Sequence, residues 1–238
     1  MTGNIPKQFP KIESPFERTY NQYGRFTVDN HVKDDYRWVF GRAAEVECVE
    51  KLDGINCAVQ LNDGDVVDVA TRRDDRGMNR VLTYGSTEHH HIVRGVQNAV
   101  RRGLLEDLGE GWFSGEVVGP KVQGNPHNVE EHIFAPFDWL RERCQYKSYG
   151  KYSTEYGAIS DWFEGNLFSL FHCYLNGASP AEASVSNGVF VEGVVFVHPE
   201  FEGPLRLENI DTRETDEYKA LATNLAKLRR EMFSWYEE

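Results

Sequence analysis

Apolar runs in the first third of the chain predict a series of β-strands. Residues 44–50 and 56–61 each combine β-branched and other apolar side chains over the length of a typical strand. Asn62-Asp63-Gly64 follows the second run and is typical of a tight hairpin turn, so residues 66–71 are predicted to return as its partner strand. We therefore expect an antiparallel sheet in this part of the chain.

Helical spacing of apolar residues alternates with further strand-like runs in the rest of the chain. A helix is expected to begin at Ser86 or Thr87, with apolar positions at Ile92, Val93, Val96, Ala99, Val100 and Leu104. Residues 112–118 and 189–197 predict buried strands, and residues 155–163 predict a helix between them. Another helix is expected to open at Thr215, with apolar positions at Tyr218, Leu221, Leu225 and Leu228. The mixture predicts an α+β fold with antiparallel sheets.

The first 40 residues lack a clear periodic pattern. Pro6, Pro10 and Pro15 interrupt them, so segment 1–40 is expected to run extended over the surface without regular folding. Nothing resembling a linker rich in Pro, Gly or Ser divides the sequence, which predicts a single catalytic domain spanning residues 1–238.

Composition narrows the functional classes. The chain has 238 residues and a net charge of −12, which by itself disfavours a polyanionic partner. Segment 70–103, however, carries seven arginines against three acidic residues. It is interpreted either as a local basic strip or as an ordinary solvated surface.

The sequence shows neither an apolar run long enough for a membrane span nor a signal-peptide core, so we expect a cytoplasmic protein, or one in the host cytoplasm if the source is viral. The cysteines lack metal-site spacing and are expected to act as small buried hydrophobes: Cys48, Cys57, Cys144 and Cys173.

Lys51 carries the most informative candidate chemistry. It lies at the end of a predicted strand, within Glu50-Lys51-Leu52-Asp53-Gly54-Ile55-Asn56, where a glycine lets the chain turn. A lysine amine is a nucleophile only when uncharged, and burial beside other cations favours the uncharged form. The alternative is a lysine that caps a hairpin, with Asp53 as a turn residue.

Five further segments follow Lys51 along the chain: Arg72-Arg73, Ser114 to Pro120, Phe134 to Asp138, Val191 to Phe196 and Ala226 to Arg230. Together with Lys51 to Asn56, and in the same order, they resemble the motifs of the covalent nucleotidyltransferase superfamily, which comprises ATP-dependent DNA ligases, RNA ligases and mRNA capping enzymes. Each has a bland alternative, such as an edge-strand charge or core packing. Their order and spacing favour the resemblance.

The resemblance implies a role for each matching residue. Lys51 would form a covalent bond with AMP derived from ATP, and Glu192 would help bind the catalytic Mg²⁺ or Mn²⁺. The expected nucleotide-binding residues are Glu50, Asp53, Gly54, Asn56, Arg72, Glu116, Phe137, Lys227 and Arg229. Within this set, Glu116 would hold the ribose, Phe137 would stack on adenine, and Lys227 and Arg229 would contact the α-phosphate.

Elementary chemistry favours several of the same assignments. Attack on the α-phosphorus of ATP builds negative charge on oxygen, which requires cations such as Lys227 and Arg229 and a metal bound by oxygen ligands such as Glu192. A carboxylate such as Glu116 suits a ribose, because it accepts hydrogen bonds from two hydroxyl groups.

RNA is favoured over DNA as the substrate, with RNA ends or a nicked duplex as the nucleic-acid partner. Asn56 matches phage-type RNA ligases, whereas DNA ligases and capping enzymes usually carry arginine at this position. Segment 119–126 also looks like small phage and archaeal RNA ligases. Because few residues follow the last motif, we expect a fold without the C-terminal OB-fold domain of DNA ligases and capping enzymes. A minimal DNA ligase and a non-catalytic ATP- or RNA-binding module remain alternatives.

The match departs from the superfamily in three places. Arg229 stands where a second lysine is usual. Segment 200–224 is a longer connection than small relatives have, and segment 140–188 matches nothing, so it is interpreted as a lid or a substrate-specific insert. The apolar residues around Lys227 also fit a helical face that would place Lys227 on a surface helix: Leu221, Leu225, Leu228 and Met232. The adjacent histidines at 89–91 are not expected to share a metal.

Overall fold

The computed structural model contains two compact units. It describes residues 9–20, 24–74, 77–80, 87–151, 153–184, 188–206 and 216–236, with only the backbone described at 72–74, 77–80, 87, 88 and 217. The first unit comprises residues 1–10, 53–142 and 203–222, and the second comprises residues 11–52, 143–202 and 223–238. Helices and antiparallel strands mix in both, which confirms the predicted α+β class. The single domain over 1–238 stays a prediction.

The first unit is built on a five-stranded antiparallel sheet with the order β6-β5-β4-β7-β8. Its strands are β4 (Ile55–Asn62), β5 (Asp65–Asp74), β6 (Gly77–Arg80), β7 (Gly111–Val118) and β8 (Ile133–Pro136). The predicted hairpin is confirmed, because Asn62 pairs with Asp65 across a two-residue turn. Asp63 and Gly64 both have positive φ, 51° and 79°, as the turns that match strand twist require.

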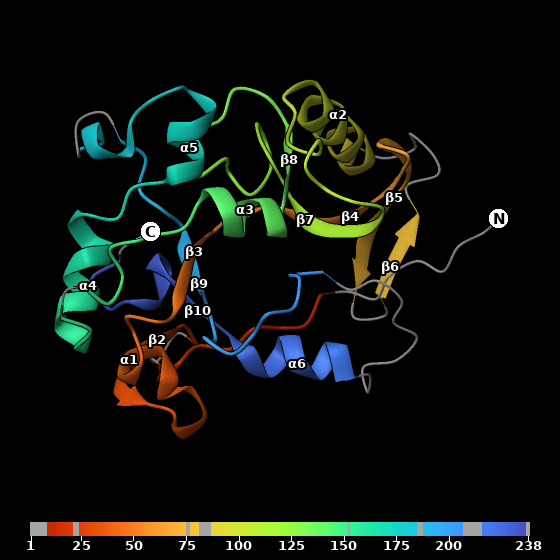
Figure 1. Cartoon of the computed structure of the whole chain (residues 1–238). Coiled ribbons are helices and arrows are strands. Elements are labelled where there is room, and N and C mark those ends of the chain that lie inside the picture. Colours follow the sequence, from red (N-terminus) through yellow and green to blue (C-terminus); the bar gives the residue numbers. More distant parts are fainter. Residues whose placement is uncertain are drawn as a thin grey trace. The chain divides into compact units, whose positions relative to one another are not determined.

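Helix α2 (Thr87–Arg101) packs against β7 and β8 of this sheet (Figure 1). Its buried face includes Ile92, Val96 and Ala99, as the helical spacing predicted. Thr87 is its first residue, while Ser86 lies outside the described residues. The remaining helices of this region are α3 (Phe137–Arg143) and α6 (Asp216–Asn224). Across the ranges described, helices are too short or too polar to cross a bilayer.

The second unit contains a three-stranded antiparallel sheet with the order β10-β9-β3. Its strands are β3 (Glu47–Lys51), β9 (Gly193–Val197) and β10 (Leu225–Arg229). Around it lie α1 (Trp38–Gly41), α4 (Tyr156–Gly165), α5 (Leu170–Leu175) and the 3₁₀ turns η1 (Asp34–Tyr36), η2 (Pro180–Glu182) and η3 (Arg230–Met232). One face of the sheet joins the core through Cys48, Val194, Phe196, Ala226 and Leu228.

Two expectations for secondary structure were wrong. The N-terminal segment contains an antiparallel hairpin of β1 (Phe16–Tyr20) and β2 (Phe26–Val32), because a proline directly before a strand breaks no hydrogen-bond ladder. The last predicted helix ends at Asn224, since β9 and the carbonyl of Glu13 offer hydrogen bonds to the backbone of residues 225–229. Helical spacing of the leucines was outweighed by this tertiary pairing.

The described part of segment 140–188 contributes to the core of the second unit, and its role as a lid or a substrate-specific insert stays a prediction. Its aromatic and aliphatic side chains enter the core of the second unit, including Tyr146, Tyr149, Ile159, Phe163 and Leu167. All four cysteine side chains are buried, as predicted.

Candidate active site

Three strands place the predicted nucleophile and the predicted phosphate ligands on one face of the second unit's sheet. Lys51 on β3 and Arg229 on β10 both lie opposite Gly193 of β9. Lys227 lies two residues earlier on β10, opposite Val195. Opposite residues, and residues two apart, share a face of a sheet, so Lys51, Lys227 and Arg229 project from the same face. Lys227 therefore lies on a strand, and the surface-helix alternative is excluded.

Glu192 joins two of these cations. Its Oε2 accepts a hydrogen bond from Lys51 Nζ at 2.8 Å, and its Oε1 accepts one from Arg229 Nε. Lys51 Nζ also donates to the carbonyl oxygen of Leu52 at 2.9 Å. Burial alone would raise the pKa of Glu192, but the charges of Lys51 and Arg229 outweigh it and hold the pKa below its usual range. Glu192 is therefore ionised near neutral pH.

Lys227 adds a further basic group that is partly withdrawn from water. Burial, together with the neighbouring charges of Lys51 and Arg229, lowers the pKa of Lys227 to about 8, and Glu192 and Glu13 offset only part of this effect. Its backbone N–H donates to the carbonyl oxygen of Glu13 at 2.9 Å, which ties this edge of β10 to the N-terminal segment. The charge of Lys227 is therefore sensitive to pH in the mildly alkaline range.

We call Lys51, Glu192, Lys227 and Arg229 the lysine cluster. It contains three basic groups and one carboxylate, so its charge favours binding of a polyanion. These side chains suit a nucleotide that brings its own metal ion better than a metal ion held by protein side chains alone. Where side chains are described, no three His, Cys, Asp or Glu residues gather as a metal site. Mg²⁺ commonly uses one or two carboxylates together with substrate phosphates, and Glu192 can supply such a carboxylate.

Gly193 allows the close approach of the strands that carry the cluster. A Cβ atom at this position would lie 2.4 Å from the carbonyl oxygen of Leu228 on β10. Because that oxygen belongs to the backbone, a larger residue would push β9 and β10 apart.

We expect Gly193→Ala to destabilise the protein by about 2 kcal/mol through this overlap. Gly157 on α4 is the matched control, because a Cβ there would meet nothing within 4 Å and Gly157→Ala should stabilise the helix slightly. Urea unfolding of both variants measures the difference. Equal midpoints for Gly193→Ala and the parent would contradict the overlap.

Glu50 projects from the opposite face to Lys51 and lies in the core. Its carboxylate is 1% exposed, accepts a 2.5 Å hydrogen bond from the Ser169 hydroxyl group, and accepts one of 2.8 Å from the N–H of Phe171 at the start of α5. Burial raises the pKa of Glu50 to about 7, despite these hydrogen bonds. The structure therefore does not bring this predicted nucleotide ligand to the lysine cluster; its carboxylate ties β3 to α5.

The free energy of unfolding should change with pH as Glu50 titrates. Its pKa is raised from 4.5 to about 7 on folding, so between these values the folded state binds more protons than the unfolded state and stability falls as pH rises. We expect the parent to lose about 3 kcal/mol relative to Glu50→Gln across this window, because the glutamine stays neutral. Urea unfolding of both proteins at several pH values measures it, and parallel curves would contradict the buried carboxyl group.

The first unit brings together Asn56 and Glu116. These residues lie directly opposite each other on β4 and β7, so their side chains share a face, and Asn56 Nδ2 donates to the carbonyl oxygen of Gly115 at 3.2 Å. Gly54 precedes β4, and a Cβ there would lie 2.4 Å from the carbonyl oxygen of Val117. The glycine of the predicted lysine motif is thus required by close backbone packing.

His127 holds the turn after the lysine, a role that the sequence did not predict. Its side chain is fully buried, and its Nε2 accepts a 2.8 Å hydrogen bond from the backbone N–H of Asp53. Nε2 is therefore the unprotonated ring nitrogen in this arrangement. The sequence showed only that a histidine followed the third motif; a contact across 74 positions leaves no local signal.

Two further residues predicted to bind the nucleotide, Phe137 and Arg72, lie at the start of α3 and on β5. Phe137 is the first residue of α3, directly after β8, and its ring packs edge-on against Phe9 with centroids 4.9 Å apart. Arg72 lies on β5 opposite Met78, and its side chain falls outside the described part of the structure.

Comparison with protein-family models identifies the family of this chain. A family model described as RNA ligase matches residues 44–205, more than half of the chain. Solved structures of Naegleria gruberi RNA ligase variants are similar to it: one with ATP and Mn is 14% identical (TM-score 0.39, covering 83% of this chain and 60% of that one). Another with AMP and Mn is 16% identical (TM-score 0.36, 84% and 62%). The chain thus spans about three fifths of their length. Curated protein sequences gave no match.

Proposed function

We propose that this chain, which belongs to the RNA ligase family, joins RNA 5′-phosphate and 3′-hydroxyl ends through AMP bound covalently to Lys51. The observation that carries the proposal is the lysine cluster: a strand-end lysine paired with Glu192 at 2.8 Å, with Lys227 and Arg229 on the same face. A lysine that only capped a hairpin would not need two further cations beside it.

The first step uses groups on this chain. The Lys51 amine, once it has lost its proton, attacks the α-phosphorus of ATP; the N–P bond forms while the bond to the pyrophosphate oxygen breaks. Lys227 and Arg229 stabilise the negative charge that builds on the phosphate oxygens. A bound Mg²⁺ or Mn²⁺, held in part by Glu192, would neutralise further phosphate charge. AMP then passes to the RNA 5′-phosphate, and the 3′-hydroxyl displaces it to form the phosphodiester.

Recognition of the nucleotide is proposed for the first-unit residues. Glu116 and Asn56 share one face, where Glu116 would accept hydrogen bonds from the ribose hydroxyls. Phe137 would stack on adenine, and Arg72 would meet a phosphate. Asp53 and Gly54 would shape the turn that leads into β4, held by His127.

Glu50 would serve the nucleotide indirectly, by anchoring β3 through α5. The RNA strand is the proposed partner and the cytoplasm the proposed location, where ATP is available and buried thiols such as Cys48 stay reduced.

The test combines adduct formation with ligation. Protein incubated with α-labelled ATP and Mg²⁺ should retain the label after denaturation, and the same protein should seal 5′-phosphorylated RNA better than a matched DNA nick. A protein that keeps the label but seals none of the substrates would form the AMP adduct without acting as a ligase. Better sealing of DNA would identify a minimal DNA ligase, and ATP binding without label would identify a non-catalytic module.

A further inference from the structure

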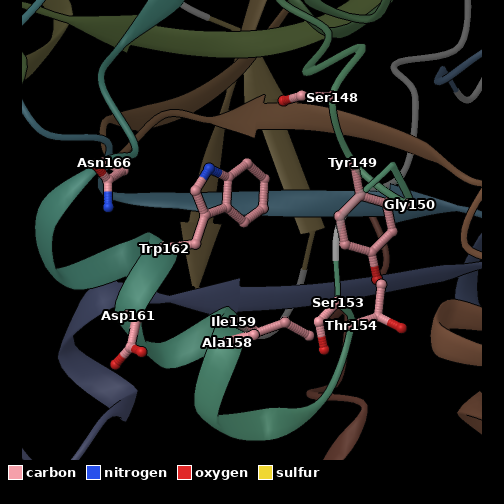
Figure 2. Close-up of a pocket in the computed structure, with 10 residues that line it drawn as sticks. All are labelled: Ser148, Tyr149, Gly150, Ser153, Thr154, Ala158, Ile159, Asp161, Trp162 and Asn166. Carbon is pink, nitrogen blue, oxygen red and sulfur yellow. The ribbon is translucent and has the colours of Figure 1, made fainter.

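The second unit contains a pocket that the proposed chemistry does not use. It has a volume of about 570 Å³ and lies between α4 and the loop that precedes it (Figure 2). Its lining residues are Ser148, Tyr149, Gly150, Ser153, Thr154, Ala158, Ile159, Asp161, Trp162 and Asn166. Figure 2 shows the rings of Trp162 and Tyr149 on two sides of this space, with Ile159 and Ala158 from α4 beside them. The volume is in the range of small-molecule sites.

The pocket is separate from the lysine cluster within this unit. The Tyr149 ring packs on Phe196 of β9, with centroids 4.9 Å apart. Phe196 belongs to the core-facing side of the β10-β9-β3 sheet, whereas Val195 shares the side of Lys51 and Lys227. The sheet therefore stands between the pocket and Lys51, so a ligand in the pocket cannot be the phosphate that Lys51 attacks.

The lining suits an uncharged, flat ligand with polar edges. The buried Tyr149 ring stacks on the half-buried Trp162 ring, with centroids 6.0 Å apart at an interplanar angle of 26°, so the more exposed aromatic surface of the lining belongs to Trp162. Hydroxyl and amide groups from Ser153, Thr154 and Asn166 supply donors and acceptors at the edge. The charged group of the lining is Asp161, a carboxylate, which disfavours a phosphate inside the pocket and accepts hydrogen bonds from hydroxyl groups.

We propose that this pocket binds one unpaired ribonucleoside of the RNA strand, away from the end that reacts. Aromatic rings stack on any base, and hydroxyl, amide and carboxylate groups bind the base edges and the ribose 2′-hydroxyl. The exposed Lys147 and Lys151 flank the lining residues 148–150 in sequence and would meet neighbouring phosphates. The inference rests on the proposed RNA ligase function and adds a subsite to it.

The test variants place a larger, charged side chain in the pocket and keep its aromatic residues Tyr149 and Trp162. Ala158 is half-buried in the lining, so Ala158→Glu should weaken binding of a short fluorescent single-stranded RNA about tenfold in an anisotropy titration. Gly157→Glu is the matched control, because it adds the same charge one position earlier on α4, exposed and outside the lining. Ser153→Glu, at the exposed rim, is a second blocking variant that leaves the core intact.

A loss confined to Ala158→Glu and Ser153→Glu supports the subsite. Parent-like affinity in both variants would overturn it, and so would an equal loss in Gly157→Glu, which would reflect general charge repulsion. AMP adduct formation, measured on the same proteins, should be unchanged by all three substitutions. If the parent forms no adduct, the ligase proposal fails, yet a selective loss of RNA affinity still supports the pocket.

Discussion

Lys51→Ala should reduce the AMP adduct below detection, because it removes the amine that stands at the end of β3 and pairs with Glu192. Lys51→Arg is the sharper variant. A guanidinium group keeps its proton, so it can replace the ion pair with Glu192 but cannot attack phosphorus. We expect both variants to fold and both to lack the adduct, measured as label from α-labelled ATP that stays on the denatured protein and by mass spectrometry of the peptide that contains Lys51.

The control for this result is Lys11→Ala, which removes an exposed lysine of the same unit. It should label as well as the parent. Label that persists in Lys51→Ala would place the nucleophile elsewhere and leave the Lys51–Glu192 pair as a structural ion pair.

Lys227→Met should slow adduct formation about a hundredfold, because it removes one of the cations that stabilise the charged phosphate oxygens. Methionine matches the length and apolar stem of lysine, and removing a half-buried charge beside Lys51 and Arg229 should not destabilise the fold. Single-turnover labelling measures the rate, and urea unfolding checks the stability. Lys219→Met, an exposed position on α6, is the control.

The same residue predicts a pH dependence. The pKa of Lys227 is lowered to about 8, so its charge is present below that pH and lost above it. Because kcat/KM for ATP reports the free enzyme, it should fall as pH rises through about 8. Bound phosphates would raise the pKa of Lys227, which moves the same fall in kcat to higher pH.

Lys227→Arg separates charge from geometry. Arginine stays protonated throughout this range, so the alkaline fall in kcat/KM should disappear even if the rate itself is lower. An unchanged alkaline limb in this variant would assign the titration to another group.

Local sequence signals predicted the parts of the fold that local chemistry decides. The Asn62-Asp63-Gly64 turn was predicted correctly because positive φ at two successive residues is a local demand. The place of Lys51 at the end of a strand followed from the same reasoning. Alternation along β3 also implies that Glu50 and Lys51 face opposite ways, but the face that enters the core depends on α5, more than a hundred residues later.

Contacts between distant segments were beyond local reasoning. Residues 225–229 have apolar spacing that suits a helix, yet pairing with β9 makes them a strand and thereby brings Lys227 to Lys51. His127 reaches Asp53 through a single hydrogen bond that no spacing rule foresees. The candidate site was thus predictable as a set of residues, through the superfamily resemblance, while the placement of each side chain required the tertiary structure.

β9 is hydrogen-bonded to β3 on one side and to β10 on the other. It therefore holds the backbone of β3, which carries Lys51, two strand spacings or about 10 Å from the backbone of β10, which carries Lys227 and Arg229. A kink in β9, such as one caused by Val195→Pro, would move Lys51 relative to Lys227 and Arg229. The side chains that react would all still be present. Catalytic competence in such an arrangement can be lost through a residue that supplies no reacting atom.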